Sequence, residues 1–202
     1  MNRALPLLAA LVAVPLAGCA STYVSPVEVT RFVGESPARL GSGTILVRAA
    51  PGEAGGSLEF AAYEQAVSAE LARLGYNVVG STGGNAGQVA ELRVAREAEQ
   101  PLLGQRSPVN VGVGGSTGSY GSGLGVGVGI NLGGGRPRET VDTFMGVIIR
   151  DNATGQALWE GRANFSASVN SEYADRQAAA ARLADALFAG FPGESGETIE
   201  VK

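Results

Sequence analysis

A glycine-rich segment from Val109 to Gly135 limits what the middle of this 202-residue chain can form. Twelve of its 27 residues are glycine, and none carries a charge. Aliphatic residues recur at every second position in two runs, one from Val109 to Val113 and one from Leu124 to Leu132. Period two gives each run one aliphatic face and one face of almost bare backbone. We therefore expect a hairpin or a long flexible loop, with its tip near Ser116 to Ser122.

The sequence leaves four roles open for this segment. One is a low-complexity insertion that is partly disordered, because glycine loses the most entropy on ordering and weakens strand interiors. A second is an ordered hairpin whose glycine face lets another backbone or surface approach closely. A third is self-assembly through uncharged strand edges. Insertion across a membrane is disfavoured, since transmembrane strands need about 9–11 residues and only Leu124 to Leu132 reaches that length.

The composition excludes several kinds of catalytic and binding site. The chain has no histidine, which removes Ser-His-Asp and Cys-His arrangements and imidazole metal ligands. Lys202 is its only lysine, so neither a P-loop nor an internal Schiff-base lysine can form. Ser116 matches the G-x-S-x-G nucleophile pattern because glycine surrounds it, but it has no histidine partner. A net charge of −4 gives no electrostatic footprint for nucleic acid, so we expect no such partner.

The first eighteen residues have the layout of a secretory signal. Arg3 supplies one positive charge, and the stretch from Ala4 to Leu16 is apolar apart from two prolines. Its thirteen residues are too few to span a bilayer, which needs about 20. Pro6 and Pro15 would both interrupt a buried helix. We therefore expect residues 1–18 to be a signal peptide.

The end of this segment, Leu16-Ala17-Gly18-Cys19, resembles the lipobox of bacterial lipoproteins. The resemblance implies cleavage between Gly18 and Cys19 and acylation of Cys19, the only cysteine. Two or three acyl chains anchor a protein stably, whereas one chain binds marginally. In lipoproteins of this type, Ala20 in place of Asp implies sorting to the outer membrane. Residues 19–26 would then be the lipidated cysteine and a linker on the periplasmic face.

Apolar periodicity predicts two helices in the rest of the chain. The first runs from Leu58 to Leu74, where apolar residues recur at spacings of three and four, and Ser57 can cap its start. The second runs from about Tyr173 to Ala189, with Asn170 or Ser171 as its cap.

Short β-branched and apolar runs predict five strands. Small residues flank Trp159 on its own strand face, which favours core packing of the indole over stacking on a ligand. The expected strands are Thr44–Ala49, Tyr76–Val79, Gln88–Arg96, Val141–Ile149 and Ala157–Phe165.

The hairpin sequence Asp151-x-x-Thr154-Gly155-x-x-Leu158-Trp159-x-Gly161, with a closing helix that ends at Phe191-Pro192, resembles the bacterial lipoproteins grouped as domain of unknown function 4136. The resemblance covers roughly Pro26 to Gly193. It implies a two-layer α/β domain over residues 27–192, with a mixed, mainly antiparallel sheet, two helices on one face and residues 109–135 as a glycine-rich insertion. Residues 193–202 would be a frayed tail or a weak edge strand. The family carries no known catalytic residues to transfer.

Together these features predict a lipid-anchored, non-enzymatic binding or scaffold module of the cell envelope. Its expected partners are the membrane, through the acyl chains, and an unknown envelope protein or glycan; no cofactor or metal is expected. One alternative is a homo-oligomer assembled through the Val/Gly hairpin. A second is a carboxylate-dependent hydrolase, for which Glu172 and Asp175 are a candidate pair on one helix face, provided that a cleft holds two carboxyls about 5–10 Å apart.

Overall fold

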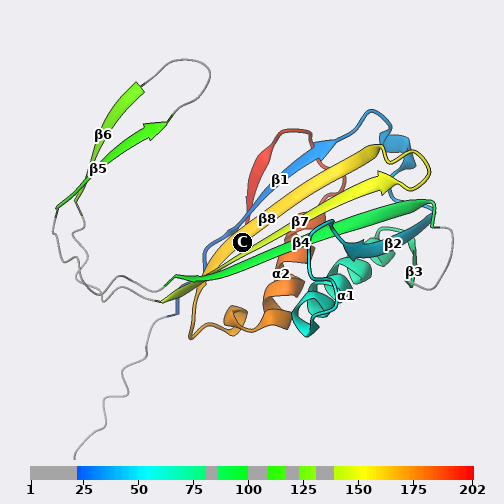
Figure 1. Ribbon diagram of the computed structural model, residues 1–202, viewed down its shortest axis with the longest axis horizontal. Coiled ribbons are helices and arrows are strands. Elements are labelled where there is room, and N and C mark those ends of the chain that lie inside the picture. The colour runs from blue at the N-terminus through cyan, green and yellow to red at the C-terminus, as the bar shows by residue number, and fades with distance from the viewer. Residues whose placement is uncertain (1–21, 81–85, 100–108, 117–122, 131–138) are drawn as a thin grey trace, which may run out of the picture.

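The computed structural model describes residues 22–80, 86–99, 109–116, 123–130 and 139–202. Its main body is a seven-stranded sheet with two helices packed on one face (Figure 1). The strand order is β3-β2-β4-β7-β8-β1-β9, and only the β2–β3 and β2–β4 pairs are parallel. This arrangement confirms the expected mixed, mainly antiparallel α+β fold. The strands of this sheet are β1 Val27–Val33, β2 Thr44–Ala49, β3 Asn77–Val79, β4 Gln88–Glu99, β7 Thr140–Asp151, β8 Ala157–Ser168 and β9 Thr198–Val201.

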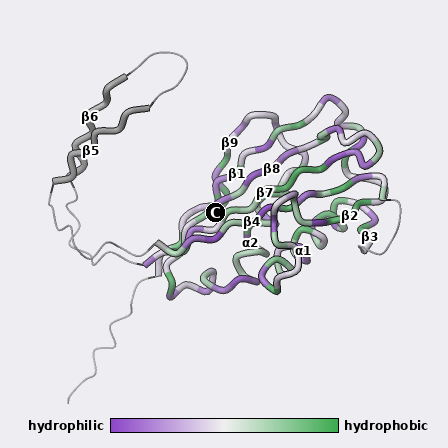
Figure 2. Tube along the Cα trace, in the orientation of Figure 1, coloured by the Kyte–Doolittle hydropathy of each residue, from purple (hydrophilic) through white to green (hydrophobic). Residues whose placement is uncertain are grey.

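The centre of the sheet is the antiparallel trio β4, β7 and β8, each twelve residues long. β4 and β7 pair over their whole length, from Gln88 opposite Asp151 to Glu99 opposite Thr140. β8 pairs with the other side of β7, with Thr140 of β7 opposite Ser168 of β8. Hydrophobic and hydrophilic residues alternate along much of β4 and β8, whereas the middle of β7 has no hydrophilic residue (Figure 2). The alternation gives the sheet one face for the helices and one face without them.

Helix α1, Leu58–Arg73, lies between β2 and β3 in the chain. The Ser57 side chain accepts a hydrogen bond from the Phe60 amide at 3.0 Å, which confirms the expected cap. Gly75 follows with φ +101°, a conformation that favours glycine just past a helix end.

Helix α2 begins later than expected. It spans Arg176–Phe188, and its cap is Asp175, whose carboxylate accepts hydrogen bonds from the amides of Gln177 and Ala178. Ser171 instead caps a separate 3-10 turn, Glu172–Ala174. The prediction of Asn170 or Ser171 as the cap of this helix was therefore wrong. A second 3-10 turn, Pro37–Arg39, precedes β2.

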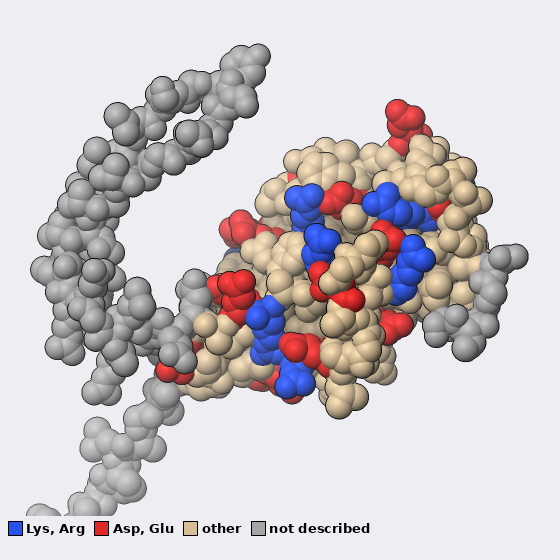
Figure 3. Space-filling view, viewed as in Figure 1, with Lys and Arg blue, Asp and Glu red and all other residues tan. Residues whose placement is uncertain are grey.

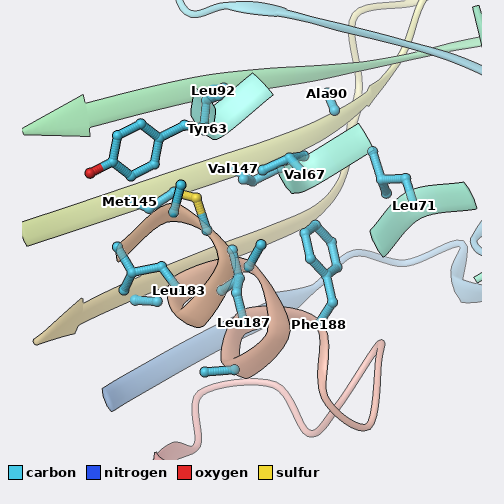
Figure 4. Packing of buried hydrophobic residues seen from close by; sticks show 14 of the residues in the cluster. Tyr63, Val67, Leu71, Ala90, Leu92, Met145, Val147, Leu183, Leu187 and Phe188 are labelled. Carbon is cyan, nitrogen blue, oxygen red and sulfur yellow. The ribbon is translucent and has the colours of Figure 1, made fainter. Parts of the chain in front are cut away.

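The core lies between the sheet and the two helices (Figure 4). Trp159 is 1% exposed; its ring stacks on Phe188 at a centroid distance of 5.4 Å, and its indole N–H donates to the carbonyl of Pro192. The predicted core role of Trp159 is confirmed. Both helices and two central strands contribute to the same cluster, through Tyr63, Val67, Leu71, Ala90, Leu92, Met145, Val147, Leu183, Leu187 and Phe188.

Two strands at the ends of the chain complete the sheet. β1 was not expected, although Val27, Val29 and Val33 alternate in it, and it pairs with both β8 and β9. β9 is a short edge strand, so this part of the C-terminal segment follows the edge-strand alternative. The described part of the expected linker is also ordered against the domain, because the Ser25 amide donates to the carbonyl of Ser166 and Val24 bridges to Ala167.

The glycine-rich segment contains an antiparallel hairpin. Its strands are β5, Val109–Ser116, and β6, Gly123–Ile130, and they form a two-stranded sheet of their own. Most of the predicted tip falls in residues 117–122, outside the described residues. Across residues 22–80, 86–99, 109–116, 123–130 and 139–202, no helix is both long and apolar enough to cross a membrane.

Candidate functional site

The helix-free face of the sheet carries the most distinctive surface of the domain. On β4, Ala90 and Leu92 are buried in the helix-covered core, so Glu91 and Arg93 lie on the opposite face. The same alternation on β7 places Phe144, Gly146 and Ile148 on the helix-free face, because Met145 and Val147 enter the core. β8 contributes Glu160, Arg162 and Asn164 to this face by its register with β7.

A shallow depression, here called the β7 groove, follows the central strand on this face. Its floor is uncharged and half-buried, formed by Phe144, Gly146 and Ile148. A Cβ atom at Gly146 would lie 3.3 Å from the ring of Phe144, so glycine leaves room for that ring along the strand. The depression has a volume of about 460 Å³, and a second one of about 310 Å³ continues it from Phe144 past Asp142 and Asn164.

Charged residues form the two walls of the β7 groove in matched rows. Gly146 is opposite Arg93 on one side and Arg162 on the other. In the next row, Ile148 is opposite Glu91 and Glu160. Strands lie about 4.8 Å apart, so the two arginine positions are separated by roughly 10 Å across a residue without a side chain. An extended chain lying along β7 would meet an apolar floor and a cation on each side.

Glu91 is the buried anchor of one wall. Its side chain is 8% exposed and accepts hydrogen bonds from Arg48 at 2.8 Å and Arg150 at 3.0 Å. Burial acts to raise the pKa of Glu91, but the hydrogen bonds and positive charges of Arg48 and Arg150 outweigh it and leave that pKa below its usual value. The carboxylate therefore stays ionised and holds both arginines in place.

The two wall arginines remain accessible to a ligand. Arg93 donates to Glu53 at 3.1 Å and Arg162 to Glu160 at 2.6 Å, yet their side chains are 60% and 56% exposed. Each guanidinium has five N–H donors, so one carboxylate partner does not exhaust it. Arg162 also lies 5.8 Å from the ring centre of Phe32. Acidic and basic side chains are interspersed in the view of Figure 3, in which several basic groups lie beside acidic ones.

A separate cavity, of about 440 Å³, lies beside α2 and is lined by residues that include Tyr173 and Arg182. The guanidinium of Arg182 lies 4.6 Å from the ring centre of Tyr173 and 5.4 Å from that of Phe165. It also donates to the carbonyl of Ser25 at 3.1 Å. Arg182 thus holds the segment just before β1 against the helix layer.

The polar cluster beneath the β7–β8 turn is structural. Asp151 accepts hydrogen bonds from the amide and hydroxyl of Thr154 and pairs with Arg39. Gln88 donates to the carbonyl of Arg39 at 2.8 Å, and Asn152 donates to the carbonyl of Ala86. These contacts occupy the polar groups of the cluster and hold the turn against the neighbouring loop.

Of the residues singled out from the sequence, none that the structure describes lines the β7 groove. Gly18 and Cys19 lie outside the described residues, and Ser116 is the last residue of β5. Glu172 lies in a 3-10 turn and Asp175 caps α2, so the expected shared helix face for this pair does not exist. Within the described ranges, no group of three or more Cys, Asp or Glu side chains is placed to hold a metal ion.

The groove residues Phe144, Gly146 and Ile148 were missed in the sequence. Their period-two pattern within β7 was visible, but Met145, Val147 and Ile149 carry the same pattern on the other face. A fully apolar run does not reveal which of its two faces the helices cover. The signal lay in the neighbours, since charged residues alternate with apolar ones on β4 and β8.

Comparison with known families and proteins gives two sequence matches. A family model described as a domain of unknown function, DUF4136, matches residues 49–193. An uncharacterized protein of Zymomonas mobilis subsp. mobilis is 45% identical over 62 residues, which make up 31% of this chain and 23% of that protein. The chain thus covers less than a quarter of that relative's length.

Two solved structures are also similar. A PDZ domain protein from Parabacteroides distasonis has a TM-score of 0.56 at 13% identity, with 89% of this chain and 38% of that chain covered. The PelC dodecamer from Paraburkholderia phytofirmans has a TM-score of 0.43 at 12% identity, with 84% and 99% covered. The first of these shows a shared fold and nothing about activity.

Proposed function

This chain belongs to the DUF4136 family, and from the lipobox that ends at Cys19 and from the β7 groove we propose that it is a lipid-anchored binding module on the periplasmic face of the outer membrane. Residues 1–18 act as its signal peptide, Cys19 carries the acyl chains, and the folded domain binds an envelope component without catalysing a reaction. The observation that carries the binding role is the β7 groove, with its apolar floor between two accessible arginines.

The order of the N-terminal segment supports the anchored arrangement. Tyr23 and Ser168 exchange hydrogen bonds, because the Tyr23 amide donates to the Ser168 hydroxyl and the Ser168 amide donates to the Tyr23 carbonyl. Only three residues separate Cys19 from Tyr23, which the domain holds through these hydrogen bonds. A tether this short keeps the domain next to the surface that holds the acyl chains.

We propose as ligand of the β7 groove an extended chain that places acidic groups between Arg93 and Arg162 and keeps them away from Glu91 and Glu160 in the next row. Arg93 and Arg162 can each bind a carboxylate or phosphate oxygen, while Phe144 and Ile148 offer apolar contact between them. An acidic envelope glycan or an acidic peptide strand has this chemistry. Glu91 is poorly suited to act as a general acid, because a general acid needs a raised pKa and the pKa of Glu91 is lowered.

The anchor is tested by replacing the acceptor cysteine. In its native host, Cys19→Ala should abolish incorporation of labelled palmitate and leave an uncleaved precursor that keeps residues 1–18. Mass spectrometry of the wild-type N-terminus should show acyl chains on Cys19. Labelled, cleaved protein from the Cys19→Ala variant would contradict the anchor.

The binding role is tested by photo-crosslinking in the same host. Benzoylphenylalanine at Phe144 should form an adduct with the ligand, whereas the same group at Ala69, an exposed residue of α1, should not. Combining the probe with Arg93→Glu and Arg162→Glu should remove most of the adduct. The matched control is Arg73→Glu, which reverses an exposed charge on α1 and should leave the adduct intact. Equal adducts from both probe positions would contradict a binding site in the groove.

A further inference from the structure

The glycine-rich insertion leaves the sheet at the end where the chain enters the domain (Figure 1). β4 ends at Glu99 and β7 begins at Thr140, and these two residues are paired. Thr140 is in turn opposite Ser168, which is hydrogen-bonded to Tyr23. The described strand ends on both sides of the insertion therefore lie on one row with the N-terminal segment.

The proposed lipidation site is close to this row in sequence. Cys19 precedes Tyr23 by four residues, and an extended chain spans at most about 3.6 Å per residue. The Cα atom of Cys19, whose sulfur would carry the acyl chains, is therefore within about 14 Å of the Cα atom of Tyr23. If Cys19 is anchored, this end of the sheet is the end nearest to the lipid surface.

The register of the hairpin separates its residues into two unlike faces. Val111 is opposite Val128 and Val113 is opposite Val126, whereas Gly112 is opposite Gly127. Paired residues share a face of a strand pair, so one face collects the aliphatic positions and the other collects glycine with one asparagine and one serine. The aliphatic positions are Val109, Val111, Val113, Leu124, Val126, Val128 and Ile130.

We infer that β5 and β6 form a second membrane contact, in which the aliphatic face of the hairpin lies on the lipid surface beside the anchor. This inference rests on the proposed function, because it requires acyl chains on Cys19. Each strand has eight residues, fewer than the about 9–11 that span a bilayer, so the contact is interfacial. No charged residue between Val109 and Gly135 opposes it.

Two membrane contacts at one end of the sheet would also fix the orientation of the domain relative to the lipid surface. An acyl anchor alone lets the domain rotate about its short tether. With the hairpin held on the same surface, the strands of the main sheet extend away from the lipid, and the β7 groove faces sideways along its length. The hairpin therefore serves as an orienting element for the binding face.

The test uses the mature, acylated chain in vesicles of phosphatidylethanolamine and phosphatidylglycerol. Because Cys19 is the only cysteine and its sulfur would be acylated, Val126→Cys supplies a single thiol for an environment-sensitive fluorophore. We expect blue-shifted, several-fold brighter emission that lipid-borne quenchers reduce. Gly127→Cys, on the opposite face, should shift less, and Ala69→Cys on α1 should not shift.

The other outcomes identify which statement fails. Emission from the Val126→Cys probe that stays water-like, on a chain whose Cys19 carries acyl mass, would overturn the membrane contact and leave the anchor standing. A blue shift that needs no vesicles and grows with protein concentration would overturn it in favour of a second copy of this chain. Absence of acyl mass on Cys19 would overturn the anchored function itself, and the inference with it.

Discussion

Asp151 shows how a single carboxylate secures the turn between the central strands β7 and β8. Its side chain is 5% exposed and accepts the hydroxyl and amide of Thr154 at 2.8 and 2.7 Å. Gly155 follows with φ +73°, a backbone conformation that other residues rarely adopt. These contacts explain why aspartate, threonine and glycine occur at this spacing.

Replacing Asp151 should change how stability depends on pH. Hydrogen bonding from Thr154 and pairing with Arg39 lower the pKa of Asp151 from 3.8 to about 2. The ionised group therefore stabilises the fold above pH 3.8, and this contribution is lost as pH falls towards about 2. Asp151→Asn keeps an acceptor for Thr154 but removes the charge facing Arg39. We expect the Asp151→Asn variant to have a lower urea midpoint of unfolding than wild type near neutral pH. The difference between the two midpoints should narrow as the pH falls from 3.8 to about 2. Equal midpoints at neutral pH would contradict the stabilising role of the Asp151 carboxylate.

Gly161 is required by the tryptophan beside it. A Cβ atom at this position would lie 2.3 Å from the Trp159 ring and 2.8 Å from a methyl of Leu187. Gly161→Ala should therefore destabilise the domain by about 1–3 kcal/mol, the usual cost of overpacking a core. Gly56→Ala is the matched control, because no atom lies within 4 Å of its added methyl group. Denaturant titration of both variants measures the difference, and equal losses would argue against crowding.

At the level of elements, the long amphipathic helix and the central strands could be predicted from the sequence. The prediction for α1 differs from the observed helix, Leu58–Arg73, by one residue at its end. It was close because the apolar stripe, the serine cap and the terminal glycine all indicate the same limits. β4, β7 and β8 were predicted in place but too short. Their outer residues are polar, and pairing with a neighbouring strand keeps these residues extended where local pattern does not.

The errors have equally local causes. β1 contains Arg31 on its core face, which disguises the alternation of its valines. The structure accommodates Arg31 by hydrogen bonds to the carbonyls of Leu187 and Ala186 at the end of α2, so the charge is satisfied by groups distant in sequence. The start of α2 was misplaced because Ser171 and Asp175 are both good helix caps. Ser171 caps the 3-10 turn that precedes the helix, and Asp175 caps the helix itself.

The cap of α1 gives a prediction at this scale. Ser57→Ala removes the acceptor of the Phe60 amide and should cost about 1 kcal/mol in the free energy of unfolding. Ser57→Asp should restore most of it, because aspartate caps helices as well as serine does. Chemical denaturation monitored by circular dichroism measures both variants. An aspartate variant as unstable as the alanine variant would show that Ser57 acts through something other than the cap.

At the scale of the whole molecule, the candidate site could not be read from the sequence. The row joins Arg93, Gly146 and Arg162, which lie on three strands and are 53 and 16 positions apart along the chain. Its composition depends on strand register, and a shift of one residue would send each side chain to the opposite face. The local motif at Cys19 needs no such register, which is why the anchor could be proposed from sequence and the groove required the fold.

From the pairing in the main sheet we predict that the segment between β4 and β7 can be removed without loss of the fold. Among the described residues, β5 and β6 pair only with each other, and Glu99 and Thr140 are already paired across the gap that the insertion fills. Replacing residues 100–139 by Asn-Gly joins these two ends through a tight hairpin turn. Shortening a 40-residue connection to two residues reduces the loop-closure cost by up to roughly 2–3 kcal/mol. We expect an unchanged or higher Tm for the shortened chain.

A point variant separates the contribution of loop length from that of the hairpin. Val126→Asp retains all 40 residues between Glu99 and Thr140 but places a charge at an aliphatic position of β6, so its Tm should match wild type. In vesicles, both this variant and the shortened chain should remain bound through Cys19 while the domain loses its fixed orientation. Polarised infrared spectroscopy of the sheet on supported bilayers measures that loss as a smaller dichroic ratio. A fall in the Tm of the shortened chain would instead mean that the insertion packs on the main sheet, since only lost contacts could outweigh the gain in loop entropy.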